Sequence, residues 1–329
     1  LHLVGESLMG WLVWDLLRNV DVLLAQKGVD ASRLMLISEP AGGGDVAAVA
    51  AALDERITGV MVQNFGGPEP ETPYPLPKDA EESFEYSGSG SWESTRNLLL
   101  SSRDGFLPWV IVAAAAPRRL VYYHEFYWDE KHDPVWKRLQ RVYGFSKAPE
   151  ALLGLAGKGF VVGSAPENSH WLPANRELLY PLMERWYRIP NPKKEYSNRL
   201  AEKELFCLTP EVTKELKPQP LHALVAQLGT ERTLAARQSL AKLTPAQQTA
   251  KLRQQWTHLL GTVTPKDNPL LNGAPLPSHQ LGQVTVERLH LCTEPGIVVP
   301  VLLMLPPQAK DKKLPIVVRV AQQMAALEG

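Results

Sequence analysis

The sequence predicts an α/β fold in which a mostly parallel sheet is flanked by helices, followed by a helical linker and a C-terminal β-rich segment. Two observations support this prediction. Short apolar runs alternate with amphipathic, helix-length segments over the first 190 residues, which is the pattern of parallel strands joined by crossover helices. From about residue 284, short strand-like runs separated by Pro/Gly turns replace that alternation.

The elements of the first part follow in a regular order. A long stretch, 65–103, interrupts them; it is rich in Gly, Pro, Ser and Glu, and its length is typical of loops that cover a site. The expected elements are a helix at 8–24 ending at Gly28, strands at 34–37, 57–62, 120–123 and 159–163, and helices at 45–53, 133–143 and 175–187.

The second part changes in character at Pro190. Charged, proline-punctuated helical sequence runs to about Leu281, and within the helix expected at 245–260 a stripe is predicted to pack in a core. The stripe consists of Leu252, Trp256, Leu259 and Leu260. Strands are expected at 284–286, 289–291, 298–305 and 316–320, separated by turns at Glu294–Gly296 and Pro306–Pro307.

Composition limits the classes of partner. The 329 residues are 44% hydrophobic, which is enough for one large or two smaller domains, and 35 basic residues balance 35 acidic ones. We therefore expect no nucleic-acid partner and, because no apolar run reaches bilayer length, no membrane span. Cys207 and Cys292 are expected to be buried or inert thiols. Leu1 is not a methionine, so we expect the native N-terminus to be missing, and the sequence indicates no compartment.

Several motifs of the first 190 residues occur in a distinctive order. They are Gly5–Trp11, Val29–Asp30, Gly42–Gly44, Ala51–Ile57, Ala116–Leu120 and Pro166–His170. Together they resemble the elbow region and the later segments of bacterial acetylxylan-esterase-like hydrolases, a carbohydrate esterase family with the α/β-hydrolase fold. The resemblance implies removal of acyl groups, with acetyl as the leading candidate, from polysaccharide or related esters by a Ser-His-acid mechanism, without a cofactor or a metal.

The nucleophile elbow departs from the family pattern Gly-x-Ser-Gly-Gly-Gly. The glycine run places Ala41 at the nucleophile position and Glu39 at the first glycine, and an alanine has no oxygen to attack an acyl carbon. Ser38, three residues upstream, is the nearest hydroxyl and is either a relocated nucleophile or a plain strand-end residue. Gly42 is placed to donate an oxyanion amide. Whether Ala41 is native or replaces an original serine is left open.

The resemblance also supplies candidates for the base and the acid. His170 follows an expected strand and takes the position of the base, and a helix-capping histidine is the alternative. The acid is expected after the strand at 120–123, where Glu125 is favoured over Asp129 because it stands close to the strand end. We expect His170 and Glu125 to meet within hydrogen-bond distance near Ala41.

Two rival sites use the same residues. A zinc or calcium site would draw on a loop cluster, but its spacing matches no metal motif and two lysines stand close by. The cluster is His124, Glu125, Asp129, His132 and Asp133. A phosphate-binding loop at Gly42–Asp45 lacks the following lysine and hydroxyl residue. Tryptophans could stack on sugar rings, although core or rim positions explain most of them.

The order of the parts leaves the domain organisation open. We expect 1–190 to be the rear half of an α/β-hydrolase domain, 191–283 a helical linker, and 284–329 a β-rich segment resembling the front of such a domain. Tandem domains or a circular permutation would each explain this order, with a second hydrolase-like domain or chain completing the sheet. A catalytically inactive module that binds carbohydrate or another domain is the alternative to an esterase.

Overall fold

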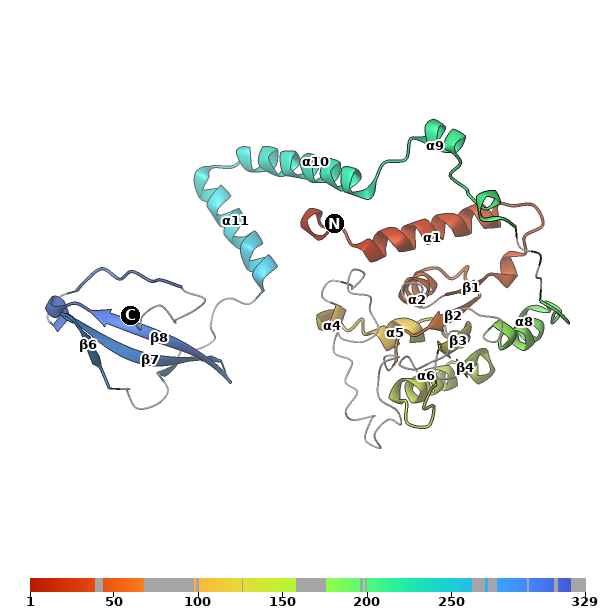
Figure 1. Ribbon diagram of the computed structural model, residues 1–329, viewed down its shortest axis with the longest axis horizontal. Coiled ribbons are helices and arrows are strands. Elements are labelled where there is room, and N and C mark those ends of the chain that lie inside the picture. Colours follow the sequence, from red (N-terminus) through yellow and green to blue (C-terminus); the bar gives the residue numbers. More distant parts are fainter. Residues whose placement is uncertain are drawn as a thin grey trace. The chain divides into compact units, whose positions relative to one another are not determined.

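The computed structural model describes residues 1–38, 44–67, 98, 101–125, 127–157, 176–195, 198, 200–261, 270–271, 277–294, 296–310 and 313–320. The chain divides into two compact units, Leu1–Thr233 and Leu234–Gly329, and the division falls within helix α10 (Leu221–Ala241). Figure 1 shows the helices and strands of both units. Among the described residues, no helix combines the length and apolar character needed to cross a membrane.

The N-terminal unit contains a four-stranded parallel sheet, as the alternation in the sequence predicts. Its strands are β1 (Met35–Ile37), β2 (Gly59–Gln63), β3 (Arg119–His124) and β4 (Leu152–Ala156), and they lie side by side in chain order. Each neighbouring pair is parallel. All four strands therefore end at the same edge of the sheet, which we call the carboxyl edge.

Helices and short turns connect these strands. They are η1 (His2–Val4), α1 (Leu8–Leu24), η2 (Ala31–Arg33), α2 (Gly44–Leu53), α4 (Ser101–Asp104), α5 (Pro108–Ala113), α6 (Pro134–Phe145), η3 (Pro149–Ala151) and α8 (Tyr180–Tyr187), followed by η5 (Glu202–Glu204) and α9 (Pro210–Leu216). The side chain of Ser7 caps α1 by accepting a hydrogen bond from the Gly10 amide at 2.9 Å. Thr209 and Asp133 cap α9 and α6 in the same way.

Two apolar clusters lie on opposite faces of the sheet. Alternate residues of a strand point to opposite faces, so Val60 and Leu120 join one cluster while Met61 and Val121 join the other. The larger cluster contains residues of α1, α2, α5 and α6, and the smaller one contains residues of α8. The sheet is thus covered by helices on both faces, which explains why all of β2 and all of β3 except Arg119 are buried.

Helix α2 is the most deeply buried helix of the unit, and its first residue must be a glycine. Residues 44–51 are all buried. A β-carbon on Gly44 would lie 2.2 Å from the carbonyl oxygen of Gln63 at the end of β2. The helix therefore begins in direct backbone contact with the carboxyl end of the neighbouring strand.

Arg118 holds the other end of α2. Its guanidinium donates hydrogen bonds to four backbone carbonyls, those of Ala51, Asp54, Ile57 and Ala114, at 2.6–3.3 Å. The first two lie at the C-terminal end of α2, where carbonyl groups lack helical partners and a cation is favourable. Arg118 therefore joins this helix end to the start of β3.

The C-terminal unit contains an antiparallel sheet around the long strand β7 (Val284–Glu294). Strand β8 (Ile297–Leu305) pairs with β7 as a hairpin, and β5 (Leu270–Leu271) and β6 (His279–Leu281) also pair with it. Helix α11 (Pro245–Leu260) and η6 (Pro307–Lys310) lie in the same unit. Of the strands expected in this part, 284–286 and 289–291 are merged into β7 and 298–305 corresponds to β8.

Several expectations differ from the structure. Strand β4 was not expected, and the strand predicted at 159–163 lies outside the described residues. Residues 316–320, predicted as a strand, have no regular structure. The α11 stripe was predicted to pack in a core, but its four side chains are 41–79% exposed. The first helix ends at Leu24 rather than at Gly28, and Cys207 is exposed.

We predict that Gly44→Ala lowers the free energy of unfolding by about 1–3 kcal/mol, because the added methyl group would force α2 away from β2. Gly144→Ala in α6 is the matched control, since a β-carbon there meets nothing within 4 Å. The control should be neutral or stabilise by roughly 0.5–1 kcal/mol. Urea unfolding followed by circular dichroism measures the stability of both variants. Equal urea midpoints for Gly44→Ala and Gly144→Ala would contradict the close contact between Gly44 and β2.

Candidate functional site

Polar side chains gather at the carboxyl edge of the parallel sheet. Ser38 directly follows β1, Asn64 follows β2, and Glu125 follows β3. In open parallel sheets, ligands bind in the crevice outside this edge. Of the predicted site residues, Ala41, Gly42 and His170 lie outside the described residues, so the expected meeting of His170 with Glu125 remains a prediction.

Ser38 is buried and its hydroxyl is engaged on both sides. The Oγ atom donates a hydrogen bond to the carbonyl oxygen of Met61 at 2.8 Å and accepts one from the amide of Gln63 at 3.0 Å. The side chain thereby extends the contact between β1 and β2 beyond the last paired residue of β1. This geometry favours the strand-end interpretation of Ser38 over that of a relocated nucleophile.

Glu125 is held at the strand end by Asn64. The Asn64 side-chain amide donates to Glu125 Oε2 at 3.0 Å, and the Glu125 backbone amide donates back to Asn64 Oδ1 at 2.9 Å. Asn64 has a left-handed backbone with φ of 50°, a conformation that asparagine tolerates better than most residues, and its own amide donates to the carbonyl of Tyr123. Glu125 is only 3% exposed. A buried carboxylate is thus fixed directly after β3.

Asp129 makes a different, local pair. Both of its carboxylate oxygens lie 2.9–3.0 Å from Nδ1 of His132, three residues later, and its carbonyl accepts hydrogen bonds from the amides of His132 and Asp133. The pair belongs to one turn of the loop between β3 and α6. Glu125 therefore remains the better candidate for the acid at the strand end.

Asp133 is the most heavily bonded carboxylate of the region. Its Oδ2 atom accepts hydrogen bonds from the Tyr122 hydroxyl at 3.1 Å and from the Trp128 indole at 2.8 Å, while Oδ1 accepts from the amides of Val135 and Trp136. The side chain is fully buried. Burial raises the pKa of Asp133, and these hydrogen bonds oppose the rise.

His124 lies beside this carboxylate but makes no hydrogen bond with it. Its Nε2 atom is 3.7 Å from Asp133 Oδ2, and its ring stacks on Trp128 with centroids 4.8 Å apart. Burial lowers the pKa of His124 from 6.5 to about 3, so its imidazole is neutral near pH 7. Burial also raises the pKa of the neighbouring Tyr123 hydroxyl well above its usual range.

The loop cluster considered as a metal site separates into distinct contacts. Glu125 bonds to Asn64, Asp129 to His132, and Asp133 to the tryptophan and tyrosine donors. Within the described ranges, no three His, Cys, Asp or Glu side chains are grouped as metal ligands.

Sequence reasoning did not name Asn64, and it named Asp133 only as a member of the rival metal cluster. Asn64 follows a buried strand and precedes Phe65-Gly66-Gly67, which is a signal for a left-handed turn that could have drawn attention to it. Asp133 precedes Pro134, which is the typical arrangement of an N-cap before proline. That signal predicts the start of a helix, but it does not predict the hydrogen bonds of Asp133 to Tyr122 and Trp128.

A scan against protein-family models finds no match, and neither does a search of curated proteins. Among solved structures, the chain aligns with "Methylesterase BT1017" at 16% identity and a TM-score of 0.40, covering 62% of this chain and 41% of that one. It aligns with a carbohydrate esterase family 15 glucuronoyl esterase from Caldicellulosiruptor kristjansonii at 18% identity and a TM-score of 0.37, covering 57% and 53%. A glucuronoyl esterase from Solibacter usitatus gives 18% identity and 0.29, covering 46% and 44%.

The chain therefore spans about half the length of these structures. All three names are those of esterases. Because the TM-scores are 0.40 or lower, the alignments carry no argument about this chain's activity, which is instead argued from its motifs and its site geometry.

We predict that stability depends on pH through His124. In the unfolded chain His124 is protonated below about pH 6.5, whereas in the folded chain it stays neutral down to about pH 3. The free energy of unfolding therefore falls as the pH falls through this range. The loss is at most about 1.4 kcal/mol per pH unit. His124→Phe should flatten this dependence in urea titrations followed by tryptophan fluorescence. His222→Phe, at an exposed position of α10, is the control, and an identical slope in all three proteins would refute the assignment.

We also predict that Asn64→Gly destabilises the chain by about 1–3 kcal/mol, because the buried Glu125 carboxylate loses the hydrogen bond from the Asn64 side-chain amide. Lys147→Gly is the matched control: Lys147 is another non-glycine residue with positive φ, 55°, and it is exposed. Glycine relieves backbone strain at both positions, so the control should be neutral or stabilising. Urea midpoints that move equally in both variants would remove the role assigned to the Asn64 side chain.

Proposed function

We propose that residues 1–190 form part of a carboxylic-ester hydrolase domain of the Ser-His-acid type, acting on acetyl groups of polysaccharide or related esters, in which Ala41 occupies the nucleophile position. The observation that carries the proposal is the reciprocal Asn64–Glu125 pair, which fixes a buried carboxylate directly after β3 at the carboxyl edge. A third triad member needs this kind of immobilised carboxylate, because its role is to orient the imidazole of the base.

The surroundings of the proposed elbow support the same function. Strand β1 leads to the elbow and α2 leaves it, and Gly44 allows the helix start to touch the end of β2. The strand-turn-helix context is the one in which a nucleophile is presented above a sheet. We propose that Gly42 donates the oxyanion amide and that His170 is the base, oriented by Glu125.

In such a site, the serine hydroxyl would attack the acyl carbon and give its proton to His170, which then returns that proton to the leaving alcohol. Water would hydrolyse the resulting acyl-enzyme and restore the serine. With alanine at position 41, the first bond cannot form. The other residues of the proposed site therefore surround position 41, which lacks the hydroxyl group that the reaction needs.

The second candidate is a catalytically inactive hydrolase-like module that binds carbohydrate or another domain. Ala41 and Glu39 motivate it, since both replace residues that the elbow chemistry requires. We further propose that residues 284–329 represent the leading strands of another hydrolase-like domain, which the antiparallel pairing of β7 and β8 supports.

The test is hydrolysis of p-nitrophenyl acetate by the parent chain and by its Ala41→Ser, Ser38→Ala and His170→Ala variants. We expect no hydrolysis of p-nitrophenyl acetate by the parent chain and measurable hydrolysis by Ala41→Ser. This result would show a site that lacks only the nucleophilic hydroxyl group. A parent that is active and loses its activity in both Ser38→Ala and His170→Ala would instead establish Ser38 as the nucleophile. Silence in every variant would favour the binding module.

Within the Ala41→Ser background, Glu125→Gln should lower kcat about 100-fold or more, because the imidazole loses its orienting carboxylate. Asp129→Asn is the matched control, because Asp129 is also a buried loop carboxylate and is paired with His132. This variant should change kcat by less than about threefold if Glu125 is the acid. A larger loss of kcat in Asp129→Asn than in Glu125→Gln would instead identify Asp129 as the acid.

A further inference from the structure

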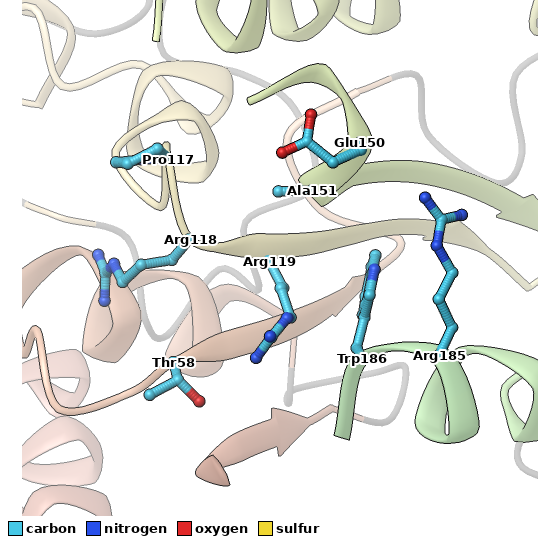
Figure 2. Close-up of a pocket in the computed structure, with 8 residues that line it drawn as sticks. All are labelled: Thr58, Pro117, Arg118, Arg119, Glu150, Ala151, Arg185 and Trp186. Carbon is cyan, nitrogen blue, oxygen red and sulfur yellow. The ribbon is translucent and has the colours of Figure 1, made fainter. Parts of the chain in front are cut away.

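A cavity of about 360 Å³ lies at the amino ends of the parallel strands. Figure 2 shows the side chains that line it. Arg118 directly precedes β3 and Arg119 is its first residue. Glu150 comes from η3 just before β4, and Arg185 and Trp186 come from the last turn of α8. The volume falls at the lower end of the range for small-molecule pockets.

This cavity is separate from the proposed ester site. Arg119 begins β3, and Glu125 follows the end of the same strand. At a strand rise of about 3.3 Å per residue, the two positions are roughly 20 Å apart. A ligand in the cavity would therefore not contact the carboxyl edge, and its binding is independent of whether the proposed hydrolase is active.

The charges of the lining favour an anion. It carries three arginines against one glutamate. The guanidinium of Arg118 is committed to backbone carbonyls, as described above. In the part of the chain that the structure describes, no carboxylate lies within ion-pairing distance of Arg119 or Arg185. Two guanidinium groups therefore remain to bind an anion.

One of these two groups is held in place. The Arg119 guanidinium lies over the ring of Tyr187, 4.6 Å from its centroid. Tyr187 is itself buried and packs so closely on β2 that a β-carbon on Gly59 would lie 2.1 Å from its hydroxyl. Because the ring beneath it cannot move freely, Arg119 loses little conformational freedom when it binds a ligand.

Trp186 gives the cavity an aromatic wall. Its half-buried side chain packs on the smaller apolar cluster, and in Figure 2 it stands between the side chains of Arg119 and Arg185. An indole surface suits a flat or ring-shaped body, and the exposed Glu150 carboxylate can accept hydrogen bonds from hydroxyl or N–H groups. A compact dianion such as phosphate would gain nothing from the indole and would be repelled by Glu150.

We propose that this cavity is a second binding site, for a small ligand that carries one carboxylate on a ring-shaped body. The guanidinium groups of Arg119 and Arg185 bind the carboxylate end or its neighbouring oxygens, and Trp186 packs against the ring. Aromatic acids and sugar acids share this chemistry, and the probes below distinguish them.

The test is titration calorimetry of the full chain with benzoate and glucuronate, beside their neutral counterparts benzamide and glucose and beside inorganic phosphate. We expect at least one carboxylate to bind and the neutral compounds to bind at least about tenfold more weakly, because they lack charge-assisted hydrogen bonds. Binding of benzoate alone identifies an aromatic acid as the ligand class, and binding of glucuronate alone identifies a sugar acid.

Variants locate the binding. Arg185→Gln and Arg119→Gln should each raise the Kd of the carboxylate about tenfold or more. Arg141→Gln on α6 is the matched control, an exposed arginine outside the cavity, and it should leave the Kd unchanged. Because Arg185 is exposed, its variant is expected to fold as the parent does, and an unchanged urea midpoint checks this even if Arg119→Gln proves unstable.

Three outcomes would overturn the proposal. They are no carboxylate binding at millimolar concentration, equal binding of the neutral compounds, and tightest binding of inorganic phosphate. Equal Kd values in Arg185→Gln and Arg141→Gln would likewise place the bound carboxylate outside this cavity. None of these results depends on ester hydrolysis. The proposed function is therefore tested separately, by the hydrolysis experiment described above.

Discussion

The buried carboxylate of Asp133 organises the carboxyl edge of the parallel sheet. Its four hydrogen bonds come from three places: the Tyr122 hydroxyl on β3, the Trp128 indole in the following loop, and two amides in the first turn of α6. Without this acceptor, donors in an apolar environment would lose their partners, which costs about 1–3 kcal/mol for each group left unsatisfied. The loop that carries Glu125 and Asp129 is therefore fixed together with the strand and the helix on either side of it.

A second polar group plays the matching role at the opposite end of β3. Arg118 bonds to carbonyls at the end of α2 and in the turns beyond it, so α2 and the strand β3, which precedes Glu125, are joined at their far ends. At their near ends, Gly44 brings α2 against β2, and Asn64 joins β2 to Glu125. The relative positions of α2 and Glu125 thus follow from backbone contacts and satisfied buried polar groups.

The sequence predicted the parts of the fold that depend on local pattern. Apolar runs and helical periodicity identified β1, β2, β3, α1, α2 and α6, because burial on both faces of a parallel sheet leaves a clear signal. Strand β4, Leu152–Ala156, was missed because its Leu-Leu-Gly-Leu-Ala composition lacks β-branched residues. The prediction that the α11 stripe packs in a core was wrong, because periodicity shows that a helix has an apolar face and does not show what covers that face. Glu125 was named as the candidate acid, but its pairing with Asn64 joins residues 61 positions apart and depends on sheet order, so local spacing could not predict that pair.

Buried carboxylates at the same edge differ in what they do, and this difference bears on the proposed activity. Asp133 caps a helix and accepts indole and phenol donors, which is sufficient reason for a carboxylate at that position. Glu125 caps none of the described helices; it stands one residue beyond β3, and the left-handed Asn64 at the end of the neighbouring strand β2 holds it there. Burying an acid costs free energy unless hydrogen bonds compensate, so an interaction module would gain little from this arrangement. A site that must orient an imidazole requires it, which favours the hydrolase over the binding module even though Ala41 supplies no nucleophile.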